Sequence, residues 1–169
     1  AAGLLPLFNM SYSVGQIHKY SVDLYGRLEE ETGQYAGLSR VSNIRLATTQ
    51  DRMDEYKQYA GVAQTIGVQV DILTPDEVVD IWPLAVKDNL IGAIRHPMDG
   101  YIQPADLTQA LAKGARDIGG QIYRNTNVMA ITRTPSGEWK VTTDKGEIIC
   151  EHVVSATGNF ARRTGEMVG

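Results

Sequence analysis

The sequence predicts a mixed α/β (α+β) fold, in which helices pack on a mixed sheet, and three observations lead to that prediction. Strands alternate with amphipathic helices up to the glycine pair Gly119-Gly120. A strand-rich stretch follows, with turn sequences at 135–137 and 144–146. The 169 residues are 43% hydrophobic, which is enough apolar material for the core of a globular protein.

Two long amphipathic helices are predicted in the first part of the chain. The first covers 11–31 and ends at Gly33, and its mostly apolar stripe consists of Val14, Ile17, Ser21, Leu24 and Leu28. The second covers 49–67, and its apolar face consists of Met53, Tyr56, Ala60, Ala63 and Ile66. Strands are expected on either side of the second helix, at 43–48 and 68–73.

Two further helices have clear start signals. Thr74 can cap a short helix, with Pro75 at its first position and Glu77 reaching back to complete a capping box. A strand at 90–95 and a turn at Asp99-Gly100 then lead to a helix over 104–120. The apolar face of that helix is expected to consist of Leu107, Leu111, Ala115 and Ile118.

The C-terminal part is predicted to contain a three-stranded antiparallel meander between two other strands. A strand at 121–124 is expected first, the meander then consists of 127–134, 138–144 and the first part of the stretch 147–157, and the final strand is its last part, 153–157. The last of them ends in "VVSAT", breaks at Gly158 and leads into a basic helix start. In open α/β sheets ligands bind beyond the carboxyl ends of strands, where a glycine lets the backbone approach a phosphate or a flavin. An ordinary left-handed turn is the alternative interpretation of Gly158.

Composition and motifs exclude several classes of function. A net charge of −4 argues against nucleic acid or an anionic membrane as a partner. The single Cys150 cannot form an internal disulfide, which fits the cytoplasm or an organelle matrix. No GxGxxG or GxxxxGK[ST] phosphate loop is present, so a self-sufficient nucleotide site is not expected. No metal site is expected either, because His18, His96 and His152 stand singly and are interpreted as surface or capping residues.

Polar and aromatic residues offer no nucleophile that can be identified locally, so catalytic residues are unknown. Asp99 and Gln103 flank the loop "DGYIQP", which is either a binding loop or a plain turn followed by a helix cap. Tyr56, Tyr59 and Trp82 are interpreted as core or lobe-interface residues.

Six blocks of the sequence, in order and over essentially the whole chain, are similar to the middle of the dimethylglycine/sarcosine dehydrogenase family: "AAGLLPLF", "LYGRLEEETGQ", "SNIRLATTQDRMDEYK", "LTPDEVVDIWPL", "MDGYIQPADLTQALAKGARDIGGQI" and "VVSATGNFARRTGEMVG". These are flavoproteins with a fold like that of D-amino-acid oxidase. The resemblance implies a partial FAD-binding Rossmann-like sheet with a β-meander, interleaved with a substrate-type lobe. Residues 1–103 are then expected to form mainly the substrate lobe and the segment near the flavin ring, and 104–169 part of the FAD-binding domain.

The resemblance also implies an activity: FAD-dependent oxidative demethylation of an N-methylated glycine, with dimethylglycine favoured over sarcosine. We expect the chain to be the central fragment of a longer enzyme and inactive alone, with its catalytic residues outside. A histidine that bonds covalently to FAD is expected just before Ala1, and tetrahydrofolate on a separate domain. In a eukaryote the compartment would be the mitochondrial matrix.

Site residues follow from the same resemblance. Gly3 and Leu4 are expected beside the flavin ring, and Val128 is expected to present its backbone to the adenosine half. The dinucleotide is expected to lie along Ala156, Thr157, Gly158 and Phe160, the last of which stands where relatives commonly have tryptophan. Tyr101 and Gln103 replace a histidine and an aspartate that are frequent in relatives, which bears on substrate preference.

Two alternatives stay open: a related FAD enzyme acting on another amine or on glycerol 3-phosphate, and a non-catalytic domain that keeps the fold. An unpaired sheet edge is expected to give weak FAD affinity and self-association. The expected partner is a small N-methyl amino acid.

Overall fold

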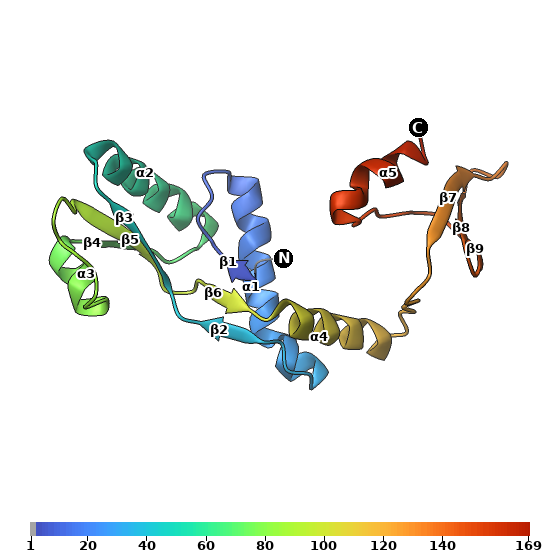
Figure 1. Cartoon of the computed structure of the whole chain (residues 1–169), viewed down its shortest axis with the longest axis horizontal. Coiled ribbons are helices and arrows are strands. Elements are labelled where there is room, and N and C mark those ends of the chain that lie inside the picture. The colour runs from blue at the N-terminus through green and yellow to red at the C-terminus, as the bar shows by residue number, and fades with distance from the viewer. Residues whose placement is uncertain (1–2) are drawn as a thin grey trace. The chain divides into compact units, whose positions relative to one another are not determined.

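The computed structural model describes residues 3–169, and the chain divides into two compact units on either side of the Gly120–Gln121 bond. The predicted mixed α/β fold class is confirmed, since the described residues form five α-helices and three sheets of three strands each (Figure 1). The expected mixed sheet is not found within residues 3–169, because the strands pair antiparallel in three separate sheets. Within this part of the chain, no helix combines the length and the apolar character that crossing a bilayer requires.

Two small sheets form the centre of the N-terminal unit. One has the order β1-β6-β2 and the other the order β3-β5-β4. Their strands are β1 (Leu4–Leu5), β2 (Leu38–Arg40), β3 (Asn43–Ala47), β4 (Asp71–Leu73), β5 (Gly92–His96) and β6 (Gly100–Ile102). The chain passes from β5 in one sheet to β6 in the other through a turn in which the Asp99 N–H donates to the His96 carbonyl, 3.2 Å away.

Helix ends follow the predicted signals closely. The four helices of the N-terminal unit are α1 (Tyr12–Thr32), α2 (Gln50–Ile66), α3 (Pro75–Ile81) and α4 (Pro104–Asp117). Gly33 and Gly67 end α1 and α2 in the left-handed conformation, with φ of 64° and 77°. The capping box between Thr74 and Glu77 is present at the start of α3.

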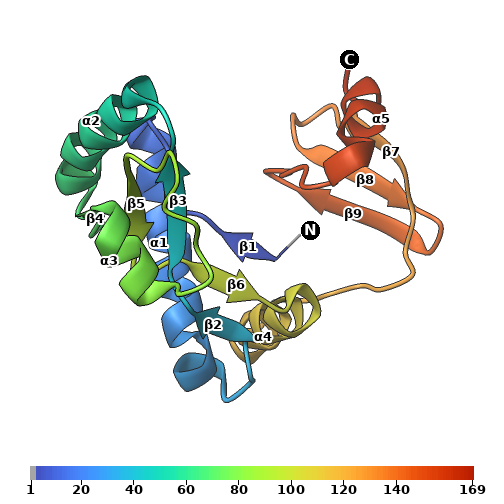
Figure 2. The same cartoon turned by 60° about the vertical axis from the view of Figure 1, so that its left-hand side comes forward.

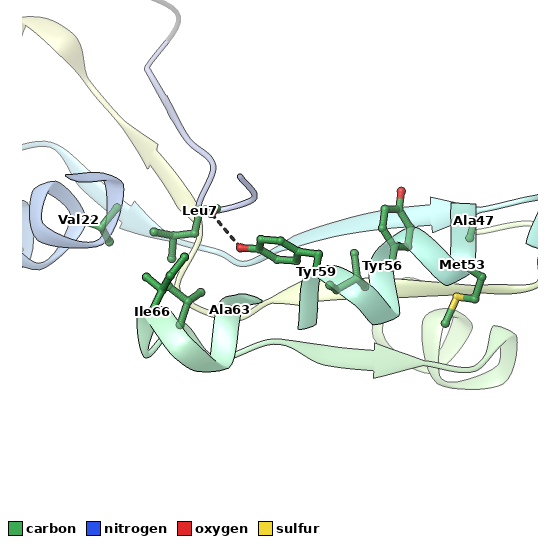
Figure 3. Close-up of a cluster of buried hydrophobic side chains, with 10 residues drawn as sticks. Leu7, Val22, Ala47, Met53, Tyr56, Tyr59, Ala63 and Ile66 are labelled. Atoms are coloured by element: carbon green, nitrogen blue, oxygen red, sulfur yellow. Dashed lines mark hydrogen bonds between the residues drawn. The ribbon is translucent and has the colours of Figure 1, made fainter. Parts of the chain in front are cut away.

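The core of the N-terminal unit lies between α2, α1 and the β3-β5-β4 sheet. Figures 1 and 2 show α2 running along that sheet, and Figure 3 shows the buried side chains between them. This core cluster contains Leu7, Val22, Ala47, Met53, Tyr56, Tyr59, Ala63, Ile66, Val68 and Ile94. A second cluster joins α1 to α4 through Leu28, Ala36, Leu107 and Ala110. A third packs α3 on its sheet through Leu73, Val78, Leu90 and Ala93.

The buried faces of two helices differ from the predicted ones. In α1, Val14 and Ile17 are exposed, and the buried residues are Gly15, Val22, Leu28 and Thr32. The reason is a close helix approach at Gly15, where an added Cβ would lie 2.4 Å from Ile66 Cδ1. In α4, Leu107 is buried as predicted, but Ile118 is 89% exposed and lies beyond the packed face. Trp82 is also exposed, so it is not a core residue, and the alternative of a lobe-interface residue stays a prediction.

The C-terminal unit contains the predicted meander. Its strands β7 (Val128–Arg133), β8 (Trp139–Thr143) and β9 (Gly146–Cys150) pair antiparallel in the order β7-β8-β9. An irregular stretch then leads to the 3-10 turn η1 (Gly158–Phe160) and to α5 (Ala161–Glu166).

Two predicted strands of this unit are wrong. Residues 121–124 and 153–157 have no strand structure, because no strand within residues 3–169 pairs with either segment. A strand exists only where its backbone groups find a ladder partner, which a local apolar pattern such as "VVSAT" cannot supply.

Candidate functional site

The main candidate site is an open cavity of about 400 Å³ in the C-terminal unit. It lies between the start of β7 and the η1–α5 segment, both of which can be followed in Figure 2. Its walls consist of Thr126, Asn127, Val128, Thr157, Phe160, Arg163, Thr164 and Met167. Three of the predicted site residues, Val128, Thr157 and Phe160, therefore come together around one cavity.

The turn at Gly158 is open on the outside. Gly158 has φ of 55°, in the left-handed region that favours glycine, and an added Cβ would meet nothing within 4 Å. All residues from Glu151 to Phe160 are exposed, so the turn is not covered by the chain's own side chains. Ala156 stands in this exposed stretch. The crevice that a ligand would need beside the turn is present.

The cavity walls combine three kinds of chemistry. Hydroxyl groups come from Thr126, Thr157 and Thr164, and the last two are hydrogen-bonded to each other at 3.1 Å. Arg163 contributes a guanidinium that has no carboxylate partner among residues 3–169, whereas its neighbour Arg162 pairs with Glu166. Val128, Phe160 and Met167 supply apolar surface. Such a wall suits a ligand with an anionic group and a flat apolar body.

The other two predicted site residues belong to the N-terminal unit. Gly3 is buried with φ of 78°, and its carbonyl accepts from the Ile102 N–H at 2.7 Å. An added Cβ at Gly3 would lie 2.5 Å from the Ile102 carbonyl oxygen, so only glycine fits. Leu4 is 70% exposed on β1 and pairs with Tyr101 of β6. The segment therefore has a fixed backbone and an outward-facing leucine.

Sequence reasoning missed a buried polar group in the N-terminal unit. His96 is 0% exposed, so its interpretation as a surface or capping residue was wrong, whereas His152 is exposed as predicted. Asp99 is 1% exposed, and its Oδ1 accepts from the Leu7 N–H at 2.9 Å. The run "LIGAI" before His96 was the available signal, because a strand buried on both faces reads as a continuous apolar run.

Burial shifts both pKa values in the direction that disfavours charge. Burial lowers the pKa of His96 from 6.5 to about 4, and the positive charge of Arg45 adds to that shift. Burial raises the pKa of Asp99 from 3.8 to about 6, although the Leu7 N–H, Arg45 and His18 oppose the rise. His96 is therefore neutral at pH 7, and Asp99 is mostly ionised.

Within residues 3–169, no group of three or more His, Cys, Asp or Glu side chains is placed to hold a metal ion. The open cavity brings together polar and aromatic groups that are suited to holding a cofactor.

Comparison with known proteins identifies a family. The family model described as FAD dependent oxidoreductase matches residues 1–169. Among curated proteins, the mitochondrial dimethylglycine dehydrogenase of Rattus norvegicus is 37% identical over 169 residues, which is 100% of this chain and 20% of that protein. The mitochondrial pyruvate dehydrogenase phosphatase regulatory subunit of Mus musculus is 35% identical over 164 residues, 97% of this chain and 19% of that protein.

Among solved structures, L-proline dehydrogenase from P. horikoshii superposes with a TM-score of 0.85 at 26% identity. The match covers 96% of this chain and 43% of that one. The chain thus spans about a fifth of the length of the curated relatives it matches.

Proposed function

Because the chain belongs to the FAD-dependent oxidoreductase family, we propose that it is part of a flavoenzyme that oxidatively demethylates an N-methylated glycine. The observation that carries the flavin part is the open cavity bordered by Val128, Thr157 and Phe160 beside the left-handed turn at Gly158. These are residues at which the family resemblance predicts contact with the dinucleotide.

The walls of the cavity fit the cofactor chemically. The guanidinium of Arg163 and the threonine hydroxyls can bind an anionic or polyhydroxylated part of FAD. Phe160 offers an exposed ring for packing against a flat group. At the opposite end of the sequence, Gly3 and Leu4 are proposed to lie beside the flavin ring. Residues 1–103 would then serve mainly the substrate lobe and 104–169 the FAD-binding domain.

The substrate class rests on the relative that matches the whole chain, a dimethylglycine dehydrogenase. In the proposed reaction the N-methyl carbon loses a hydride, water adds to that carbon, and the products are the demethylated amine, formaldehyde and a proton. FAD, when bound, supplies the hydride acceptor. A covalent histidine before Ala1, a tetrahydrofolate domain and a mitochondrial matrix or cytoplasmic location belong to the same proposal.

A substrate panel tests this function. The full-length protein that contains this chain is purified, and reduction of an electron-accepting dye is followed with dimethylglycine, sarcosine and glycerol 3-phosphate. We expect the highest kcat/KM with dimethylglycine, with formaldehyde formed in proportion to dye reduced. Reduction by glycerol 3-phosphate alone would replace this proposal by a related FAD enzyme of the same fold.

A second candidate function is a non-catalytic regulatory domain that keeps the fold. It is favoured by the 35% identity to a phosphatase regulatory subunit, which is close to the identity with the dehydrogenase. Flavin content and turnover separate the two candidates. Dye reduction by any N-methyl amino acid excludes the non-catalytic alternative, whereas a folded full-length protein with no turnover on the whole panel supports it.

A further inference from the structure

The backbone of Leu7 is held on both sides by buried side chains. Its N–H donates to Asp99 Oδ1 at 2.9 Å, and its carbonyl accepts from the Tyr59 hydroxyl at 2.9 Å. Figure 3 shows the second of these bonds between α2 and the N-terminal segment. Asp99 is 1% exposed and Tyr59 is 0% exposed, so water does not compete for either bond. We call this pair of bonds the Leu7 clamp.

The Leu7 clamp holds the chain just beyond the end of the hydrogen-bond ladder between β1 and β6. β1 pairs with β6 through Leu4–Tyr101 and Leu5–Gly100. Pro6 has no amide hydrogen and cannot extend the pairing. The next N–H along the chain, that of Leu7, is taken by the side chain of Asp99, which directly precedes β6.

The residues around the clamp leave little freedom to the segment. Phe8 packs on Tyr59 with ring centroids 4.3 Å apart, and Arg45 lies 4.5 Å above the Phe8 ring. At the other end, the Gly3 carbonyl accepts from the Ile102 N–H. The segment 3–8 is therefore fixed at both ends, and β1 lies between the two fixed points.

A buried carboxyl group at position 99 lowers the stability of the fold. Its Oδ2 has no hydrogen-bond partner among residues 3–169, although the atom is buried. A buried carboxylate with an unbonded oxygen destabilises a fold, whereas a charged acceptor gives a stronger bond to an N–H. The carboxyl group of Asp99 therefore holds the Leu7 N–H at a cost in stability.

We propose that Asp99 and Tyr59 are positioning residues that fix the Gly3–Leu5 segment through the backbone of Leu7. This inference rests on the proposed function in one respect, since Gly3 and Leu4 of that segment are the residues proposed to lie beside the flavin ring. Neither side chain is proposed to touch substrate.

The test measures backbone hydrogen exchange in the full-length protein, with and without FAD. Asp99→Ala is expected to speed exchange in peptides covering residues 3–10 by about tenfold or more, because the Leu7 N–H loses a charged acceptor. Asp99→Asn should restore part of the slow exchange, since its amide oxygen can accept the same bond but carries no charge. Tyr59→Phe should speed exchange in the same peptides by a smaller factor.

Val78→Ala is the matched control, because Val78 is 0% exposed in the α3 cluster and has no part in the clamp. It should lower stability without a selective change at residues 3–10. If Asp99→Ala and Val78→Ala change that segment equally, or if the segment exchanges as fast in Asp99→Asn as in Asp99→Ala, the clamp proposal is wrong.

The absorbance spectrum of bound flavin gives a second readout. Asp99→Ala should shift it and Val78→Ala should not, and an unchanged spectrum in Asp99→Ala would contradict a positioning role at the flavin. A wild-type protein that binds no flavin would instead overturn the proposed function, and the exchange result would still decide whether the clamp exists.

Discussion

The two units differ sharply in how many of their side chains are buried. The N-terminal unit has three hydrophobic clusters, and its central strand β5 is buried almost throughout. In the C-terminal unit Ile131 is the one buried side chain among residues 121–169. Apolar side chains such as Ile149, Val154 and Phe160 are exposed there.

The difference indicates how each unit is stabilised. A unit with a closed core gains its stability from its own packing, whereas an open meander with exposed apolar groups is stabilised by whatever covers them. This agrees with the proposal that the C-terminal unit is a cofactor-binding part, because its exposed apolar residues include a wall of the candidate cavity. The predicted self-association through an open sheet edge is a further way of covering the same surface.

The largest expected effect comes from removing equal side-chain volume in the two units. Ile94→Ala, in the 0% exposed centre of β5, should lower the free energy of unfolding by about 2–5 kcal/mol. Ile149→Ala, on the exposed part of β9, should change it by about 0.5 kcal/mol or less. Urea unfolding of the two variants measures both, and similar losses would remove the contrast between the units.

The second expected effect is a pH dependence of stability that arises from two buried groups of the N-terminal unit, His96 and Asp99. The pKa of His96 is lowered in the folded state, so its contribution to stability is present above pH 6.5 and is lost as the pH falls toward about 4. The pKa of Asp99 is raised, so its contribution is present below pH 3.8 and is lost as the pH rises through about 6. The two contributions oppose each other over the same range.

In the wild type the two contributions to the pH dependence of the free energy of unfolding largely cancel. A variant that lacks one of the two groups should therefore show the pH dependence caused by the other. Relative to wild type, His96→Leu should lose stability as the pH rises from 4 to 6, because only the Asp99 contribution is left. Asp99→Asn should lose stability as the pH falls from 6.5 to 4. Each change is about 3 kcal/mol, from a shift of about two pKa units. Thermal unfolding between pH 4 and 7 checks this, and parallel curves for all three proteins would contradict it.

Much of the fold could be predicted from local sequence signals. Thr74 and Glu77 lie three residues apart and cap α3 as expected, and Gly67 ends α2 where the periodicity stops. These features depend on neighbours within one or two helical turns, which a single sequence shows directly. The meander was equally visible, because its turns at 135–137 and 144–146 are short.

What could not be predicted depends on contacts between distant residues. Asp99 and Leu7 are 92 positions apart in the sequence, so no local pattern shows that they are hydrogen-bonded. From the sequence alone, Asp99 as a turn residue cannot be distinguished from Asp99 as a buried hydrogen-bond acceptor. The stretches 121–124 and 153–157 have strand-like composition but no partner in residues 3–169. In the candidate cavity, Val128, Thr157 and Phe160 were predicted from the family resemblance, whereas Arg163 and Met167 were not, because nothing local marks them as cavity walls.

A third effect concerns the cavity itself. Phe160→Ala should weaken FAD binding about tenfold, because an aromatic packing surface is worth about 1–3 kcal/mol. Ile149→Ala is the control, since Ile149 is equally an exposed apolar residue but does not line that cavity. The two variants are compared by titration with FAD, followed by flavin fluorescence, in full-length protein whose proposed covalent histidine is replaced by alanine so that FAD binds reversibly. Equal affinities would place the flavin elsewhere.

The smallest effect separates the helix starts of the two units. The side chain of Thr74 caps α3, and Thr74→Ala should cost about 1 kcal/mol of stability. Thr157 occupies the corresponding position before η1 but makes no capping bond, so Thr157→Ala should be close to neutral. Thermal unfolding of the two variants checks this pair, and an equal loss would show that the C-terminal turn is held more firmly than its exposure indicates.

The most direct measurement of the central claim compares hydrogen exchange of the C-terminal unit in flavin-free and flavin-loaded full-length protein. If the open cavity faces the cofactor, exchange should slow in peptides covering 126–128 and 157–167, with the β8–β9 turn at 144–146 unchanged. Tight flavin binding that leaves 126–128 and 157–167 unprotected would contradict the assignment of this cavity to FAD.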